Sequence, residues 1–297
     1  MNAADLMNLV ISAFLLAGVY AAMSVGMTII YGVMKIVNLA HAGFLMLGAY
    51  FVYELYERFG IDPLLGVVLA FPTFFLLGMT VHWLLVRRIP TSDQPTLPSL
   101  LLLFGLWLIL QNLAYLIWGN SDRSILTPRT LSVFHLGRIT FPMVQLVVFG
   151  AAVASLTGLE FVLHKTWFGK AVRALMQNSE AGKIVGVKVE RTARVSFGVG
   201  IAFAGAAGGL LAMMYSFSPD FGGLFLLRAF VIIVLGGLES FTGIAIGALI
   251  LALVETFSIL ILPANYQPAI AFSLLVVALV VLPQGVAGLW SRRRRLA

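Results

Sequence analysis

Cysteine is absent from this chain of 297 residues, and charged residues are scarce, at 10% of the total. Without cysteine there is neither a disulfide framework nor a thiol site. A soluble domain of this length needs a charged exterior, whereas here 61% of the residues are hydrophobic and the mean hydropathy is +1.02. The composition therefore excludes an ordinary soluble protein and indicates a membrane protein.

Motifs for energy coupling and metal binding are also missing. Neither Gly169-Lys170-Ala171 nor Gly182-Lys183-Ile184 completes the GxxxxGK[ST] loop that holds nucleotide phosphates. If ATP is used, we expect it to bind partner subunits, so that this chain has no cofactor and no catalytic residue. The four histidines do not stand at metal-ligand spacings, and no relay of Asp, Glu and His runs through several spans as in proton-driven carriers. We therefore predict no metal site.

Long uncharged stretches dominate the chain. They cover residues 6–34, 36–53, 64–86, 97–118, 141–159, 195–219, 229–238, 240–254 and 269–290. We predict an all-α integral membrane protein with about eight transmembrane helices and a short broken or re-entrant helix, forming a single permease domain over 1–297. The short segment, 229–238, would be about 15 Å long as a helix, half a bilayer. A plain turn between two ordinary spans is the alternative.

The basic residues predict the orientation. Alternating crossings place fourteen of the 19 Lys and Arg on one side: Lys35, Arg87, Arg88, the seven between His164 and Arg194, and Arg292–Arg295. The other side holds Arg58, Arg123, Arg129, Arg138 and Arg228. Because lysine and arginine are enriched in cytoplasmic loops, we predict that the N-terminus is outside and the C-terminus inside. The net charge of +7 then reflects orientation and contact with anionic lipid, and not nucleic-acid binding.

A polar stripe runs along the first predicted span. Tyr20, Ser24, Thr28, Tyr31 and Lys35 follow spacings of three and four residues and therefore share one helical face. Such a face should point into the bundle. It either lines a polar path or consists of hydroxyls that bond the carbonyl four residues earlier and only ease packing.

Three further polar residues fall within predicted spans. Asn38 and His41 lie three residues apart on the next predicted helix, where they would cap or cross-link helices. Glu255 lies about 10 Å short of the turn at Pro263, where a carboxylate facing lipid would cost about 2.5–3.5 kcal/mol. We expect Glu255 to face the bundle interior or to be protonated. A role in transport and a helix-linking hydrogen bond both remain open.

The longest predicted cytoplasmic loop, residues 164–194, contains a short capped helix. Asn178 or Ser179 can cap its start, Glu180 suits the N-terminal dipole, and Gly186 can adopt the left-handed conformation that ends a helix. We expect Ala181 and Gly182 to leave a shallow surface for a partner protein. The alternative is a surface helix that only joins two spans.

Four motifs in order resemble the branched-chain amino acid ABC permeases, in particular their H-type (LivH-like) subunits. They are Gly26–Gly32 followed by Ile36–His41; Arg173–Ala174 through Gln177–Asn178, Ala181 and Gly186–Val187; Leu235–Gly237 with Gly243 and Gly247; and Pro283–Gly285. The resemblance covers nearly the whole chain. It departs at Ala42, where a glycine often follows the histidine, and at Glu239, where a small or uncharged residue is more usual.

The resemblance implies a heteromeric importer in the inner (plasma) membrane. Its other parts would be an M-type permease, two cytoplasmic ATPases and a periplasmic or extracellular solute-binding protein. Branched-chain or other hydrophobic amino acids are the expected solutes, with urea, short amides and aromatic acids as alternatives. A stand-alone channel or ion-coupled carrier is the alternative of another class. The candidate pathway residues are Thr28, Tyr31, Asn38, His41, Gly236, Gly237 and Glu255, and the candidate ATPase-coupling residues are Asn178, Ser179, Glu180, Ala181, Gly182 and Gly186.

Overall fold

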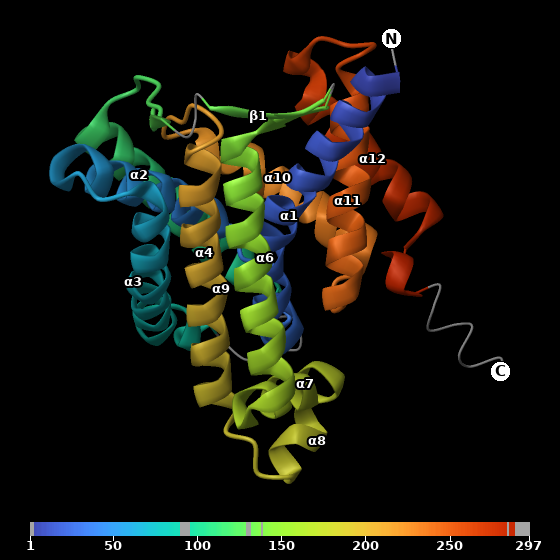
Figure 1. Ribbon diagram of the computed structural model, residues 1–297. Helices are drawn as coiled ribbons and strands as arrows, with labels where there is room; N and C mark the ends of the chain where they lie inside the picture. The colour runs from blue at the N-terminus through green and yellow to red at the C-terminus, as the bar shows by residue number, and fades with distance from the viewer. Residues whose placement is uncertain (1–2, 90–95, 129–131, 138, 284, 289–297) are drawn as a thin grey trace.

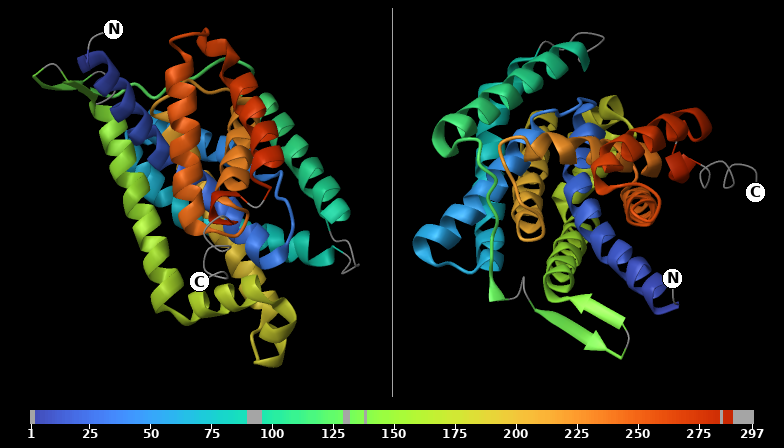
Figure 2. Two further views of the ribbon diagram at one scale, coloured as in Figure 1. Left: turned by 90° about the vertical axis from the view of Figure 1, so that its right-hand side faces the viewer. Right: turned by 90° about the horizontal axis from the view of Figure 1, so that it is seen from above.

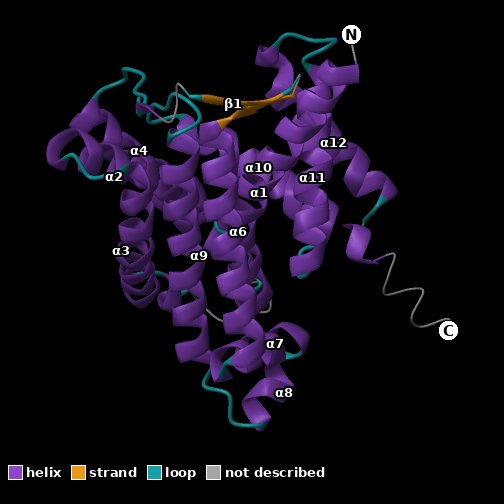
Figure 3. Ribbon diagram, in the orientation of Figure 1, coloured by secondary structure: helices purple, strands orange, loops and turns teal. Residues whose placement is uncertain are grey.

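The computed structural model describes residues 3–89, 96–128, 132–137, 139–283 and 285–288, and this part is almost entirely helical (Figures 1 and 3). Its elements are α1 (Ala3–Met34), α2 (His41–Phe59), α3 (Pro63–Leu84), η1 (Val86–Arg88), α4 (Thr96–Trp118), β1 (Val133–Leu136), β2 (Ile139–Pro142), α6 (Met143–Lys165), α7 (Trp167–Gln177), α8 (Ser179–Ile184), α9 (Val189–Ala212), α10 (Phe221–Gly236), α11 (Phe241–Ser258), η2 (Ala264–Tyr266) and α12 (Gln267–Val281).

Seven helical segments in the described part are long and apolar enough to cross a membrane, and α10 is a shorter apolar helix. The all-helical membrane class is therefore confirmed, and seven of the about eight predicted transmembrane helices are among these segments. The remaining one, α2, is not among them because Glu54, Glu57 and Arg58 give its C-terminal half a charged character. The orientation stays a prediction. Six of the basic residues used for it, Arg129, Arg138 and Arg292–Arg295, lie outside the described residues.

Polar side chains set several helix starts. The Asp62 carboxylate accepts a hydrogen bond from the Leu64 amide, and Pro63 occupies the first turn of α3. Thr166 caps α7 in the same way through the Gly169 amide, and Ser240 caps α11 through the Gly243 amide. Sequence-local chemistry therefore decides where these helices begin.

Helix α9 lies at the centre of the bundle and packs against α1, α2 and α3. Glycines allow this packing: a Cβ on Gly200 would collide with Gly26 of α1, and one on Gly48 of α2 would collide with Gly205. Gly209, one turn after Gly205, likewise packs closely against Val52 and Val67.

The two ends of the bundle carry different structures. A β-hairpin, β1 paired antiparallel with β2, contacts α1 and α6 at one end, and it was not predicted (Figure 2). The helices α7 and α8 form a compact unit at the opposite end (Figure 1). The sequence pattern predicts α8 but not α7. The uncharged stretch that follows begins at residue 195, whereas α9 begins at Val189.

Candidate functional site

Glu255 lies in the bundle interior, as predicted, with 1% of its surface exposed. Its carboxylate accepts a hydrogen bond from the Tyr20 hydroxyl at 2.6 Å and another from Nε of Arg228 at 2.8 Å. Arg228 also donates to the Leu224 carbonyl at 3.2 Å and stacks over the Phe225 ring at 5.0 Å. This buried cluster joins α1, α10 and α11.

Arg228 is the site residue that sequence reasoning missed. The grouping of Arg228 with the outer loops is wrong, because it lies inside α10 and is 8% exposed. In the sequence, the charge of Arg228 interrupts an apolar stretch, but a charge can lie within a bundle when it is paired. The available signal was Glu255 itself, because a buried carboxylate needs a cation or strong donors nearby.

A second polar contact joins the end of α1 to the connection between α10 and α11. Nζ of Lys35 forms an ion pair with Oε1 of Glu239, and both side chains are about half exposed. Lys35 has a φ of 55°, in the left-handed region that few non-glycine residues adopt. Because Tyr20 and Lys35 stand fifteen residues apart, α1 is held against α10 and α11 at two levels about 22 Å apart.

A sharp backbone turn joins α10 to α11. Gly237 has a φ of 101°, which favours glycine, and the backbones of Gly236 and Gly243 touch, so a Cβ on either would collide with the other. The preceding helix is longer than the predicted 229–238, because Phe221 to Arg228 extend it. Gln284 of the predicted closing motif lies outside the described residues.

Between its two polar contacts, the stripe on α1 carries one hydroxyl with a local partner and one without. The Ser24 hydroxyl donates to the Tyr20 carbonyl at 2.7 Å, which is the local packing role. Oγ1 of Thr28 is buried and has no hydrogen-bond partner within the described part of the chain. Nζ of Lys35 lies 5.9 Å from the centre of the Tyr31 ring.

The chain doubles back between α1 and α2. Although α1 ends at Met34, Nε2 of His41 lies 3.0 Å from the Met23 carbonyl oxygen, so residues 35–40 run back along α1 by about 16 Å. The prediction that Asn38 lies on a helix is therefore wrong, since it precedes α2. Both Asn38 amide atoms and Nδ1 of His41 are buried without a hydrogen-bond partner among the residues the structure describes. Residues 36–40 are therefore non-helical backbone that lies largely inside the bundle.

The predicted capped helix in the 164–194 loop is confirmed as α8. The Asn178 side chain accepts a hydrogen bond from the Ala181 amide at 3.0 Å, Glu180 pairs with Lys183 at 2.7 Å, and Gly186 has a φ of 84°. Ser179 is the first residue of the helix.

The two small residues of α8 face opposite ways. Ala181 is exposed, but Gly182 is buried, and a Cβ there would meet Leu175 of α7 at 2.8 Å. The expectation that Gly182 shapes the outer surface is therefore wrong. The α7–α8 unit instead exposes large apolar side chains: Ile184, Val185 and Trp167 are 86%, 76% and 84% exposed. Exposed apolar groups of this size are typical of a protein interface.

Comparisons with known proteins cover nearly all of these elements. Residues 9–282 match the family described as branched-chain amino acid transport system / permease component. The chain is 28% identical over 284 residues to the high-affinity branched-chain amino acid transport system permease protein LivH of Escherichia coli (strain K12), covering 92% of each chain. It is 26% identical over 281 residues to the corresponding permease protein BraD of Pseudomonas aeruginosa, covering 91% of each.

A more distant relative carries the name of another solute. The chain is 30% identical over 195 residues to the xylose transport system permease protein XylH of Haemophilus influenzae, covering 56% of this chain and 51% of that protein. The matched family range contains both polar contacts of α1, the non-helical residues 36–40 and the α7–α8 unit. The apolar helices and this match make the chain a multi-pass membrane protein and a transport subunit. It belongs to the family of permease components of branched-chain amino acid transport systems.

Proposed function

We propose that this chain is the permease subunit of an ATP-binding-cassette importer that carries branched-chain or other hydrophobic amino acids across the inner membrane. The family match over residues 9–282 carries the proposal. An M-type permease, two cytoplasmic ATPases and an external solute-binding protein complete the assembly. ATP binds the ATPases, since the chain has no complete phosphate-binding loop.

The solute pathway runs beside the polar face of α1. Unpaired polar atoms of Thr28, Asn38 and His41 support this placement, because buried hydrogen-bonding groups need a partner and a passing solute or water can supply one. Non-helical backbone inside a bundle also favours a position next to a cavity. The remaining pathway residues are Tyr31, Gly236, Gly237 and Glu255.

The α7–α8 unit couples transport to ATP hydrolysis. It stands at one end of the bundle, carries exposed apolar side chains, and contacts α1, α6 and α9 through α7. A force applied to this unit therefore reaches three helices directly. Asn178, Ser179, Glu180 and Gly186 set the shape of α8, and Gly182 seats it on α7.

Reconstitution of the complete importer tests this function and identifies the solute. The permease is purified with its M-type partner and ATPases, and hydrolysis is measured with the binding protein loaded from a panel of leucine, isoleucine, valine, phenylalanine, urea, acetamide and xylose. We expect the branched-chain amino acids to stimulate hydrolysis and uptake into proteoliposomes. Stimulation by urea, an amide or the sugar alone would contradict the amino-acid assignment, and uptake without ATPases would contradict the importer class.

A further inference from the structure

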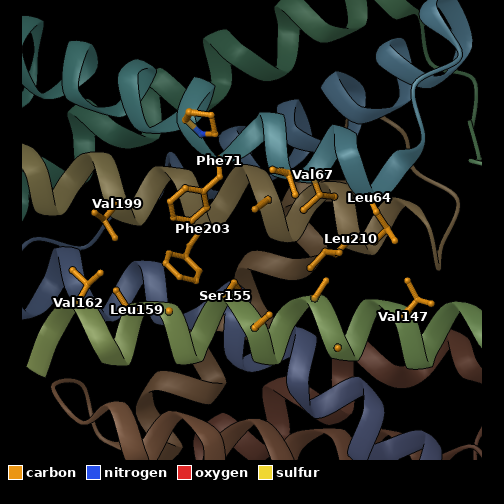
Figure 4. A pocket seen from close by; sticks show the side chains of 17 residues that line it. Leu64, Val67, Phe71, Val147, Ser155, Leu159, Val162, Val199, Phe203 and Leu210 are labelled. Atoms are coloured by element: carbon orange, nitrogen blue, oxygen red, sulfur yellow. The ribbon is translucent and has the colours of Figure 1, made fainter. Parts of the chain in front are cut away.

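A long apolar groove lies between α3, α6 and α9 (Figure 4). Its volume is about 940 Å³, and 17 residues line it. Ser155 carries the one polar side chain among them, and its hydroxyl already donates to the Ala152 carbonyl at 2.7 Å. A zwitterionic solute would find no charged or polar partner here, so the groove is distinct from the pathway beside α1.

The groove exists because α6 packs mainly against α1 and α7, and not against α3 or α9. Small residues line its α6 wall, and a Cβ on Gly150 or Gly158 would meet nothing within 4 Å. The rings of Phe71 and Phe203 meet edge to face at 5.3 Å on the opposite wall. From Val147 to Val162 the groove runs about 22 Å along α6, which fits within the ~30 Å of hydrocarbon in a bilayer.

The shape and the lining of the groove suit lipid. Acyl chains are thin, flexible and wholly apolar, so they can follow a long groove whose walls are almost entirely apolar.

Basic side chains stand beyond the α7 end of the groove. Lys165 ends α6 three residues after Val162, Arg191 lies in the first turn of α9, and α7 contacts both helices. Both side chains are exposed and form no ion pair within the described part of the chain. On α6, Oε1 of Glu160 lies 3.1 Å from Nδ1 of His164. Basic residues between helices at the cytoplasmic side of a membrane attract anionic headgroups.

We propose that this groove binds the acyl chains of an anionic phospholipid, whose phosphate contacts Lys165 and Arg191. The lipid fills the space between α6 and the α3–α9 pair, and so stabilises the position of the helix that leads into the α7–α8 unit. This binding goes beyond the proposed function, because it depends on neither the transported solute nor the ATPase.

Native mass spectrometry of the full-length permease tests the proposal, with phosphatidylglycerol or phosphatidylcholine titrated into detergent. Wild type should retain one phosphatidylglycerol in preference to phosphatidylcholine. Gly158→Leu fills the groove and should reduce phosphatidylglycerol retention at least tenfold, as should Gly150→Leu. Replacing Lys165 or Arg191 by Gln should weaken phosphatidylglycerol binding about fivefold each and leave phosphatidylcholine unchanged. Gly105→Leu on α4, where a Cβ also meets nothing within 4 Å, is the matched control and should retain lipid normally.

Three results would overturn the proposal. If wild type retained the two lipids equally, the charge of the headgroup would play no part in binding. Wild-type retention in both groove-filling variants, each eluting as a monodisperse species in gel filtration, would place any bound lipid elsewhere. Disulfide cross-linking of a Gly158→Cys variant to cysteines in the M-type permease would show that a protein subunit, and not lipid, occupies the groove.

Discussion

Two carboxylates hold α1 to its neighbours in different surroundings. The side chain of Glu255 is 2% exposed and its partner Arg228 9%, whereas Glu239 and Lys35 are 47% and 45% exposed. Water screens the second pair, and such exposed pairs contribute about 0–1 kcal/mol. In the first pair, removal of one partner leaves the other charge buried without compensation, at a cost of about 3–5 kcal/mol.

Glu255→Gln should therefore destabilise the permease by about 3–5 kcal/mol, because Arg228 would lose its counter-ion. Glu239→Gln is the matched control and should change stability by less than about 1 kcal/mol. Adding Arg228→Met to Glu255→Gln should recover part of the loss, since the unpaired charge is then gone. Reversible denaturation of purified protein in mixed micelles measures all three. Equal effects of the two Glu→Gln changes would refute this account of the buried pair.

At the scale of the elements, the contact between α10 and α11 depends on backbone proximity. Gly243→Ala should destabilise the bundle by about 1–3 kcal/mol, because the added methyl group overlaps the Gly236 backbone and the two helices must separate. The same denaturation experiment measures the loss. Gly105→Ala, in an open position on α4, is the control and should be nearly neutral. A neutral Gly243→Ala would mean that the two helices have room to move apart.

The α7–α8 unit can be perturbed without disturbing the bundle. Ala181→Trp places a bulky ring on the exposed side of α8, and should reduce co-purification of the ATPase and solute-stimulated hydrolysis by tenfold or more, while the permease itself remains stable. Glu57→Trp, at an exposed position of α2, is the control for an added surface tryptophan. Wild-type assembly and uptake with Ala181→Trp would leave α8 as a simple connector.

For the whole molecule, orientation decides which partners meet which end. The α7–α8 end carries Lys165, Lys170, Arg173, Lys183, Lys188, Arg191 and Arg194, and these predict a cytoplasmic location. After Arg194, a reporter that works only in the cytoplasm should be active and one that works only outside should be inactive. After Phe59, we expect the opposite result. External activity of the first fusion would invert the topology, and with it the sites assigned to the ATPase and the lipid headgroup.

The sequence by itself determined the features that depend on local chemistry. Long apolar runs require lipid as solvent, so the helical membrane class was predictable from composition. The Asn178 cap and Gly186 marked α8 because a capping side chain acts within three residues of the helix start. Glu255 was correctly placed in the interior, since facing lipid would be too unfavourable for its carboxylate.

Only the tertiary structure decided which distant groups meet. Arg228 pairs with Glu255 across 27 residues and Lys35 with Glu239 across 204, and no local pattern specifies such a choice among several candidate partners. The return of the chain between α1 and α2 likewise depends on the His41 contact with Met23, which forms only when both helices are packed. The apolar groove has the same origin. Helix α6 looks like any other span in sequence, and its separation from α3 and α9 follows from which neighbours it packs against.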